Sequence, residues 1–257
     1  MMTAEALVTG ADANLVRATQ VWASACQDGE CWERDGLTIA AAGLPMRSFN
    51  NVFLRQRPER PAESLAEVTA YFRERGRPFR LRFLEGAPAP SEDELAEWGL
   101  QRHGGIPSLA LESLRAQADA SELTIRPVEN ELTLQHHTEV VAEGFEWEAS
   151  SLSGVFTPRL IDAPEWRGYV GYLDGRPVAS SQLVLTDGVA GVYYVATIED
   201  ARRRGFGEAM TRQALNEGAV AGCPIASLQA SPIGEPIYRR MGFERVGYYR
   251  TYVPKED

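Results

Sequence analysis

The sequence predicts an α/β protein built from two similar halves, and three observations support this fold class. The chain has 257 residues, enough for one large domain or two medium ones. Segments with the spacing of amphipathic helices alternate with β-prone segments along its length. In addition, the order helix, Gly-x-Pro turn, strand, short helix and strand occurs twice, over residues 64–111 and 208–253. We therefore expect a duplicated domain.

The first half contains alternating helix and strand candidates. Its helices carry apolar residues at helical spacing and begin at capping residues; they are predicted at residues 12–26, 64–75 and 91–98, with Asp12, Ser64 and Ser91 as N-caps. Its strands are rich in β-branched or alternating apolar residues, and they are predicted at residues 37–41, 51–54, 78–84 and 108–111. Residues 27–30 are expected to form a polar turn.

The second half follows a polar, alanine-rich stretch over residues 113–122, which is the predicted linker. An Asp174-Gly175 pair between two apolar segments indicates a tight hairpin turn. The predicted strands are residues 123–128, 169–173, 178–185, 191–195, 224–230 and 243–252. The predicted helices are residues 130–144, 208–221 and 236–241, and residues 145–164 are expected to be irregular.

Composition narrows the class of function. The formal net charge is −10 and the pI is near 5.0, which argues against a general nucleic-acid binder and weakly favours a cationic substrate such as an amine. No apolar run is long enough to span a membrane, and the N-terminus lacks the features of a signal peptide. Three cysteines do not suggest a disulfide framework, and three histidines lack metal-ligand spacing. We expect a cytoplasmic protein without metal, membrane or nucleic-acid partners.

The most informative stretch runs over residues 194–210, where a β-prone segment leads through a basic glycine loop into a helix. The loop reads Arg202-x-x-Gly205-x-Gly207. Glycines let the backbone approach a ligand closely, and the positive end of the helix dipole favours an anion at the same point. The loop is therefore a candidate pyrophosphate cradle. Residues 55–64, at the corresponding place in the first half, contain no such motif, so only the second half should hold the ligand.

Residues 123–253 resemble the GNAT superfamily of acyl-CoA-dependent N-acetyltransferases. The resemblance rests on the Arg202, Gly205 and Gly207 loop and on Tyr238-x-x-x-Gly242-Phe243 downstream, in the family's order and spacing. The first half resembles a degenerate copy, as in tandem members of the family. The resemblance implies an α/β fold with two domains, residues 1–115 and 123–257, each a mixed, mostly antiparallel twisted sheet flanked by helices.

The resemblance also implies a site and a reaction. Acetyl-CoA would be the co-substrate, with its pyrophosphate on the loop amides and its pantetheine arm along a strand that splays from its neighbour. Tyr238 would protonate the leaving thiolate. The residues assigned to the coenzyme are Val195, Ala196, Thr197, Arg202, Arg203, Arg204, Gly205, Phe206, Gly207, Glu208 and Ser231. The acceptor would be a primary amine of a small molecule or a peptide N-terminus, and the protein would be a monomer or a homodimer.

Two departures from the family pattern concern this site. The family's Asn after the second splayed strand is absent, and Ser231 stands in that segment; the family's proline before the loop is absent too. An acyl-CoA-binding sensor without turnover remains an alternative function.

Several side chains can be interpreted in two ways: as functional residues, or as residues that pack in the core or lie on the solvated surface. These are the loop arginines, Tyr238, the possible bases Glu146 and Glu148, and the possible acceptor-pocket residues Trp147, Phe156 and Trp166. The polar pair Asn50-Asn51 is expected to have a structural role in a turn or at a strand edge.

Overall fold

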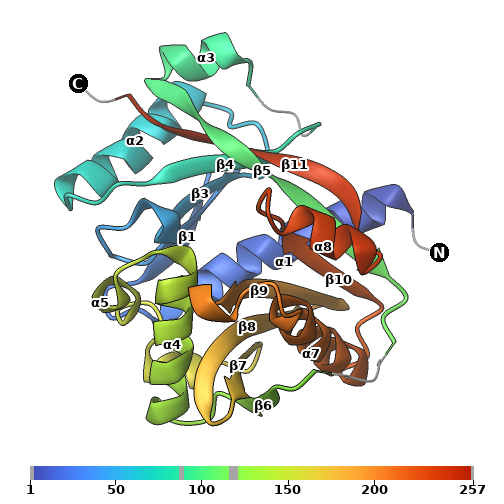
Figure 1. Ribbon diagram of the computed structural model, residues 1–257. Coiled ribbons are helices and arrows are strands. Elements are labelled where there is room, and N and C mark those ends of the chain that lie inside the picture. Colours follow the sequence, from blue (N-terminus) through green and yellow to red (C-terminus); the bar gives the residue numbers. More distant parts are fainter. Residues whose placement is uncertain (1–2, 87–89, 116–120, 256–257) are drawn as a thin grey trace.

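The computed structural model describes residues 3–86, 90–115 and 121–255. Within these ranges the strands form one continuous, twisted, 11-stranded sheet with the order β1-β2-β3-β4-β11-β5-β10-β9-β8-β7-β6 (Figure 1). Most neighbours are antiparallel; the pairs β3–β4 and β9–β10 are parallel. The predicted α/β class and mixed sheets are confirmed, with the sheets of the two halves joined edge to edge.

The elements of the first half are α1 (Ala4–Ala25), β1 (Glu30–Arg34), β2 (Leu37–Ala41), η1 (Arg47–Phe49), β3 (Asn50–Leu54), α2 (Pro61–Glu74), β4 (Arg80–Leu84), α3 (Glu92–Glu97) and β5 (Leu100–Glu112). Those of the second half are β6 (Thr124–Pro127), α4 (Glu131–Phe145), α5 (Ala149–Leu152), α6 (Pro158–Ile161), β7 (Trp166–Leu173), β8 (Arg176–Thr186), β9 (Val189–Thr197), η2 (Glu199–Ala201), α7 (Phe206–Val220), β10 (Ile225–Gln229), α8 (Glu235–Arg240) and β11 (Glu244–Pro254).

The last strand of each half pairs with the other half. β11 pairs with β4 of the first half, and β5 pairs with β10 of the second half, both antiparallel. β11 and β5 also pair with each other along most of their length, and Figure 1 shows them crossing between the two halves. The halves therefore share backbone hydrogen bonds at the centre of the sheet. The domain division at residues 115 and 123 stays a prediction, since part of the expected linker, residues 116–120, lies outside the described residues.

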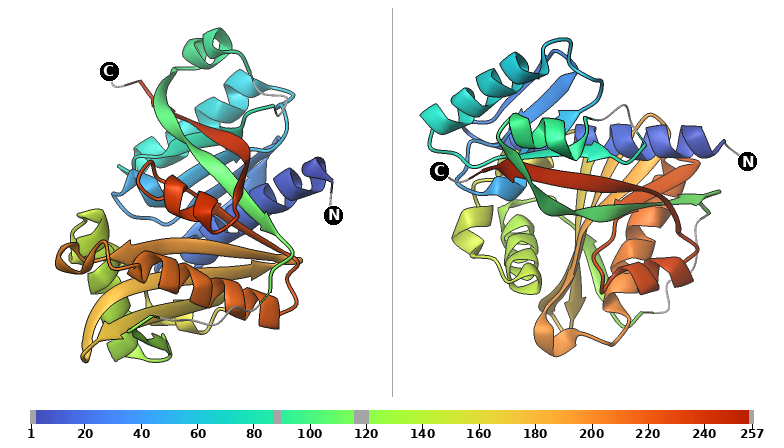
Figure 2. Two further views of the ribbon diagram at one scale, coloured as in Figure 1. Left: turned by 45° about the vertical axis from the view of Figure 1, so that its right-hand side comes forward. Right: turned by 90° about the horizontal axis from the view of Figure 1, so that it is seen from above.

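Helices cover the two faces of the sheet in different ways. α1 lies between the halves (Figure 2), and it packs together with α4 on one face, where Trp22, Val141, Tyr193 and Tyr249 belong to one buried cluster. α7 packs on the opposite face through Phe206, Met210 and Ala214. We refer to these as the α1 face and the α7 face. In the first half, α2 packs on Leu81 and Phe83 of β4.

The prediction for α1 is wrong at its start. The helix begins at Ala4, where the Thr3 hydroxyl accepts the N–H of Ala6, and not at Asp12. The Asp12 carboxylate instead accepts the Tyr249 hydroxyl at 2.6 Å and pairs with Arg55 at 2.8 Å. Long-range contacts of this kind leave no local sequence signal.

Other elements differ from expectation for local reasons. The predicted turn lies at residues 27–28, but the strand β1 that follows it was not predicted; its mostly exposed position at the sheet edge explains its polar composition. α2 begins at Pro61, which suits the first helical position, so Ser64 is not its N-cap. Two single-turn helices, α5 and α6, lie in the segment expected to be irregular. The N-cap of α3 at Ser91 is confirmed as predicted, and Asn130 is the N-cap of α4.

None of the described helices combines the length and apolar character needed to cross a membrane. Cys26, Cys31 and Cys223 are all free thiols.

Candidate functional site

The start of α7 presents free backbone N–H groups. Gly205 has φ 83°, in the left-handed region, and it is the N-cap of α7 without a side-chain partner. The first backbone N–H of the helix that bonds within the chain is that of Ala209, which donates to the Gly205 carbonyl at 3.0 Å. Between Arg203 and Glu208, no backbone N–H donates to a group in the described part of the chain. This is the anion-binding end of a helix with its donors unused.

The arginine side chains of the loop contact the protein. Arg202 donates to the carbonyls of Thr197 and Gly144, both at 3.2 Å, and so joins the end of β9 to the end of α4. Arg204 pairs with Glu122 at 2.9 Å and lies over the Phe206 ring. The structure thus gives Arg202 and Arg204 roles in shaping the loop. Contact between the coenzyme and Arg202, Arg203 or Arg204 stays a prediction.

β9 and β10 diverge beside this loop. Their parallel pairing ends at Gly191 and Ser227, although β9 continues to Thr197 and β10 to Gln229. On its other edge β9 has a bulge, because Tyr194 and Val195 together oppose one residue of β8. Tyr194 has φ 47°, which a non-glycine residue rarely adopts. The predicted splay is present, and it leaves the β10-facing edge of Val195, Ala196 and Thr197 unpaired.

Tyr238 lies on α8, on the α7 face of the sheet. Its ring meets the Phe243 ring edge-on at 5.9 Å between centroids and packs partly against the α7 cluster. Burial raises the pKa of its hydroxyl to about 12, while a hydrogen bond with Thr211 of α7 acts in the opposite direction. The phenol is therefore protonated across the physiological pH range, as a proton donor must be.

Ser231 has a local structural partner. Its hydroxyl accepts the Gly234 N–H at 3.1 Å in the turn before α8. A Cβ at Gly234 would lie 2.9 Å from the Tyr238 ring, so glycine allows this turn to lie against the tyrosine. Contact between Ser231 and coenzyme remains a prediction.

The candidate bases and acceptor-pocket residues lie in different environments, and only some of them contact Tyr194. Glu146, at the left-handed C-cap of α4, and Glu148 are both exposed. Trp147 and Phe156 have ring contacts with Tyr194, with centroids 6.5 and 5.2 Å away. Trp166 is buried and donates to Gln182, which identifies it as a core residue. Two surface hollows of about 390 and 410 Å³, between α1 and β2 and between α4 and α5, lie away from the α7 loop.

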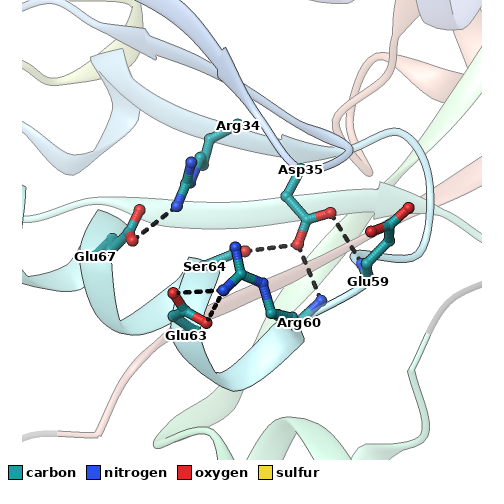
Figure 3. A network of polar contacts seen from close by, with 7 residues as sticks. All are labelled: Arg34, Asp35, Glu59, Arg60, Glu63, Ser64 and Glu67. Atoms are coloured by element: carbon teal, nitrogen blue, oxygen red, sulfur yellow. Dashed lines mark hydrogen bonds and ion pairs between the residues drawn. The ribbon is translucent and has the colours of Figure 1, made fainter.

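The corresponding helix start in the first half is already occupied by a carboxylate. Asp35, in the β1–β2 turn, accepts the backbone N–H groups of Glu59 and Arg60 at 2.9 and 3.1 Å and the Ser64 hydroxyl at 2.7 Å (Figure 3). These bonds lower the pKa of the Asp35 carboxyl, and the hydrogen bond from Ser64 has the largest effect. The first half therefore neutralises its own helix N-terminus.

Comparisons with known proteins agree with this geometry. The profile of the acetyltransferase (GNAT) domain matches residues 187–246, which span β9, the loop, α7, β10 and α8. This part of the chain is therefore similar to a GNAT acetyltransferase domain. A GCN5-related N-acetyltransferase from Kribbella flavida has a similar fold over 96% of both chains, with a TM-score of 0.74 and 20% identity.

Two other similar structures extend this result. A GCN5-related N-acetyltransferase from Sphaerobacter thermophilus covers 86% of this chain and 78% of its own, with a TM-score of 0.57 and 18% identity. A tandem GNAT protein from the clavulanic acid biosynthesis pathway covers 86% and 79%, with a TM-score of 0.57 and 12% identity. The search among curated proteins found no match. Identities this low establish a shared fold, which extends over both halves of the chain.

The sequence did not indicate the positions that Tyr194, Arg80 and Arg82 take in the structure. Tyr194 was predicted to be an ordinary strand residue, and its bulge has no local signature. The arginines alternate with Leu81 and Phe83, which normally indicates a solvent-facing side of a strand. In the structure Arg82 is 5% exposed. Among the described residues, no group of three or more His, Cys, Asp or Glu side chains could hold a metal ion.

Proposed function

We propose that the chain is an acyltransferase that moves the acetyl group of acetyl-CoA directly to a primary amine. The observation that carries this proposal is the set of unbonded backbone N–H groups at the start of α7. These groups lie beside the edge of β9 that does not pair with β10. Tyr238 lies on the same face as α7. The similarity of residues 187–246 to a GNAT acetyltransferase domain supports the same reaction class.

In this proposal the second half binds acetyl-CoA through its backbone. The amides of residues 203–208 bind the pyrophosphate, where the dipole of α7 adds to their hydrogen bonds. The pantetheine arm extends along the open edge of β9. A backbone N–H beyond the Tyr194 bulge polarises the thioester carbonyl.

The transfer itself needs no covalent enzyme intermediate. The acceptor loses its ammonium proton, and the neutral nitrogen attacks the thioester carbon, so that a C–N bond forms and the C–S bond breaks. The leaving thiolate takes the hydroxyl proton of Tyr238, and the tyrosinate regains a proton from the newly acylated nitrogen, which leaves a neutral amide. In this proposal the acceptor reaches the thioester from the α1 face, where Tyr194 lies, and Tyr238 donates its proton from the α7 face.

Release of CoA thiol from acetyl-CoA, measured with a panel of primary amines, tests the proposal. Replacement Tyr238→Phe should lower kcat by about 10²- to 10⁴-fold and leave acetyl-CoA affinity unchanged. Tyr71→Phe, a half-buried tyrosine of α2, is the matched control and should retain full kcat. Since the pKa of Tyr238 is about 12, wild-type kcat should show no alkaline loss from this group below about pH 11. An equal kcat in Tyr238→Phe would remove the tyrosine from the mechanism.

An acyl-CoA-binding protein without turnover is the second candidate. It is favoured by the exposed Ser231, whose hydroxyl is engaged within its own turn at the place where the family has a coenzyme-contacting Asn. Calorimetric binding of acetyl-CoA combined with no thiol release from any amine would select this alternative.

A further inference from the structure

Arg80 and Arg82 lie on the α1 face of β4, in the first half of the chain. Their neighbours Leu81 and Phe83 pack toward α2, and side chains alternate along a strand, so the two arginines point the other way. On that side Arg82 lies between the rings of Phe53 and Tyr249, with its guanidinium carbon 5.7 and 5.0 Å from their centroids. Both guanidinium groups lie near enough to the Tyr194 hydroxyl to lower its pKa against the effect of burial.

Neither arginine has an acidic partner. No carboxylate in the described ranges lies within ion-pair distance of Arg80 or Arg82, although thirteen other pairs of this kind occur. Arg82 Nε is buried and has no hydrogen-bond acceptor. Asp12, which attracts Arg82 electrostatically, is already bonded to Arg55 and Tyr249. The Asp12 carboxylate thus interacts with two guanidinium groups, those of Arg55 and Arg82.

Arg80 is held in position rather than neutralised. Its Nε donates to the Asn51 side-chain oxygen at 2.7 Å, and one terminal nitrogen donates to the Ser48 carbonyl at 2.9 Å. The pKa of Arg80 is lowered to about 9, mainly by burial and to a smaller extent by the charge of Arg82. Arg80 therefore stays charged at neutral pH. A buried cation and a partly buried one beside it are costly without a counter-charge, unless an anion joins them.

The surroundings connect these arginines to the proposed reaction. Tyr194, at the β9 bulge, contacts Phe49 with 6.3 Å between ring centroids and Trp147 with 6.5 Å. Phe49 comes from the first half and Trp147 from the second, so both halves line the α1 side of the bulge. An acceptor entering from this side meets the thioester at β9 and the guanidinium groups on β4.

We propose that Arg80 and Arg82 bind an oxyanion of the acceptor, so that the substrate is an amine that also carries a carboxylate or phosphate group. The inference rests on the proposed acetyltransferase function and specifies its substrate class. Planar guanidinium groups bind such oxyanions through paired, charge-assisted hydrogen bonds. The first half then supplies part of the acceptor site, while the negative net charge of the whole chain says little about this local region.

Matched acceptors test the proposal by thiol release. Free α-amino acids are compared with their amides, and aminoethyl phosphate with ethanolamine; the two pairs separate carboxylate from phosphate recognition. The acid-bearing member of a pair should have the higher kcat/KM by about 10- to 150-fold, the value of hydrogen bonds to charged groups. A kcat/KM that is equal or higher for the neutral members would overturn the proposal.

Variants then locate the effect. Arg82→Gln should lower kcat/KM for the acid-bearing amine by a similar factor, change that for the neutral amine little and leave the KM for acetyl-CoA unaltered. Arg82→Lys should restore part of the loss. Arg75→Gln, at an exposed arginine after α2, is the control and should behave as wild type. Thermal unfolding checks that each variant is folded. Equal losses for both amines in a folded Arg82→Gln would mean that the arginine only supports packing.

A binding measurement separates this inference from the proposed function. Calorimetry compares N-acetylated amino acids with the corresponding N-acetyl amides, on wild type and on Arg82→Gln. If no amine is acetylated but the N-acetylated acids bind better than their amides and lose this preference in Arg82→Gln, the proposed catalysis fails and the oxyanion site stands. If thiol release occurs with no preference for acids, the enzyme stands and the oxyanion site fails.

Discussion

The N-termini of α2 and α7 occupy corresponding places in the two halves, but their donor groups have different partners. At α2, the Asp35 carboxylate binds two backbone N–H groups and the Ser64 hydroxyl (Figure 3). At α7, the glycine loop leaves the amides of residues 203–208 without a partner in the described chain. A helix N-terminus attracts an anion in both halves. The first half has an internal anion, whereas the second half is available for an external one.

This difference suggests how a duplicated unit divides its roles. With its helix start occupied, the first half contributes elsewhere: β4 pairs with β11, β5 pairs with β10, and Arg80 and Arg82 face the β9 bulge. The second half keeps the loop, the splayed strands and Tyr238. The two units therefore keep the same order of elements, but they differ at the helix start where a ligand would bind.

A negative charge introduced at each helix start should give the largest contrast. Gly207→Glu places a carboxylate among the α7 amides and should lower acetyl-CoA affinity by about 100-fold or more, equivalent to about 2.7 kcal/mol. Gly207 has ordinary backbone angles, and the nearest atom to an added Cβ is 3.8 Å away, so the fold should accept the change. Isothermal calorimetry measures the affinity.

Ala62→Glu is the matched control, because Ala62 is exposed and has the same second position in α2 that Gly207 has in α7. It should leave acetyl-CoA affinity unchanged. Unchanged affinity in Gly207→Glu, or an equal loss in both variants, would contradict the assignment of the cradle to α7.

A smaller effect is expected for Asp35→Asn. The variant keeps the shape of the side chain but removes the charge opposite the α2 dipole, so its thermal midpoint at pH 7 should lie below that of wild type. Because the folded pKa of Asp35 is lowered, its contribution is present above the unfolded value of 3.8 and is lost as the pH falls through the folded value. The two unfolding midpoints should therefore converge in acid. A difference that is the same at all pH values would show that charge is not the cause.

Local features of the site could be predicted from the sequence, because they depend on residues close together in the chain. Gly205 and Gly207 marked the loop, and the spacing of Tyr238 to Gly242 and Phe243 marked the short helix. The hairpin at Asp174 and Gly175 has positive φ at both residues, as the pair predicted.

Features that depend on distant contacts could not be predicted. The exchange of β5 and β11 arises from strand pairing across the halves, and each strand carries only its own β pattern. Asp35 belongs to an Asp-Gly turn, which gave no sign that its carboxylate reaches the start of α2. Likewise, Asn50 and Asn51 were correctly predicted as structural, but the guanidinium group that Asn51 orients lies 29 residues further along the chain.

The stoichiometry of acetyl-CoA binding tests the difference between the halves most directly. Calorimetric titration of the full-length wild-type chain should give one site per chain, which Gly207→Glu removes and Ala62→Glu retains. Two sites per chain would contradict the account, because the first half would then bind coenzyme despite Asp35. A single site that survives Gly207→Glu and disappears in Ala62→Glu would contradict it as well, since the halves would have the opposite roles.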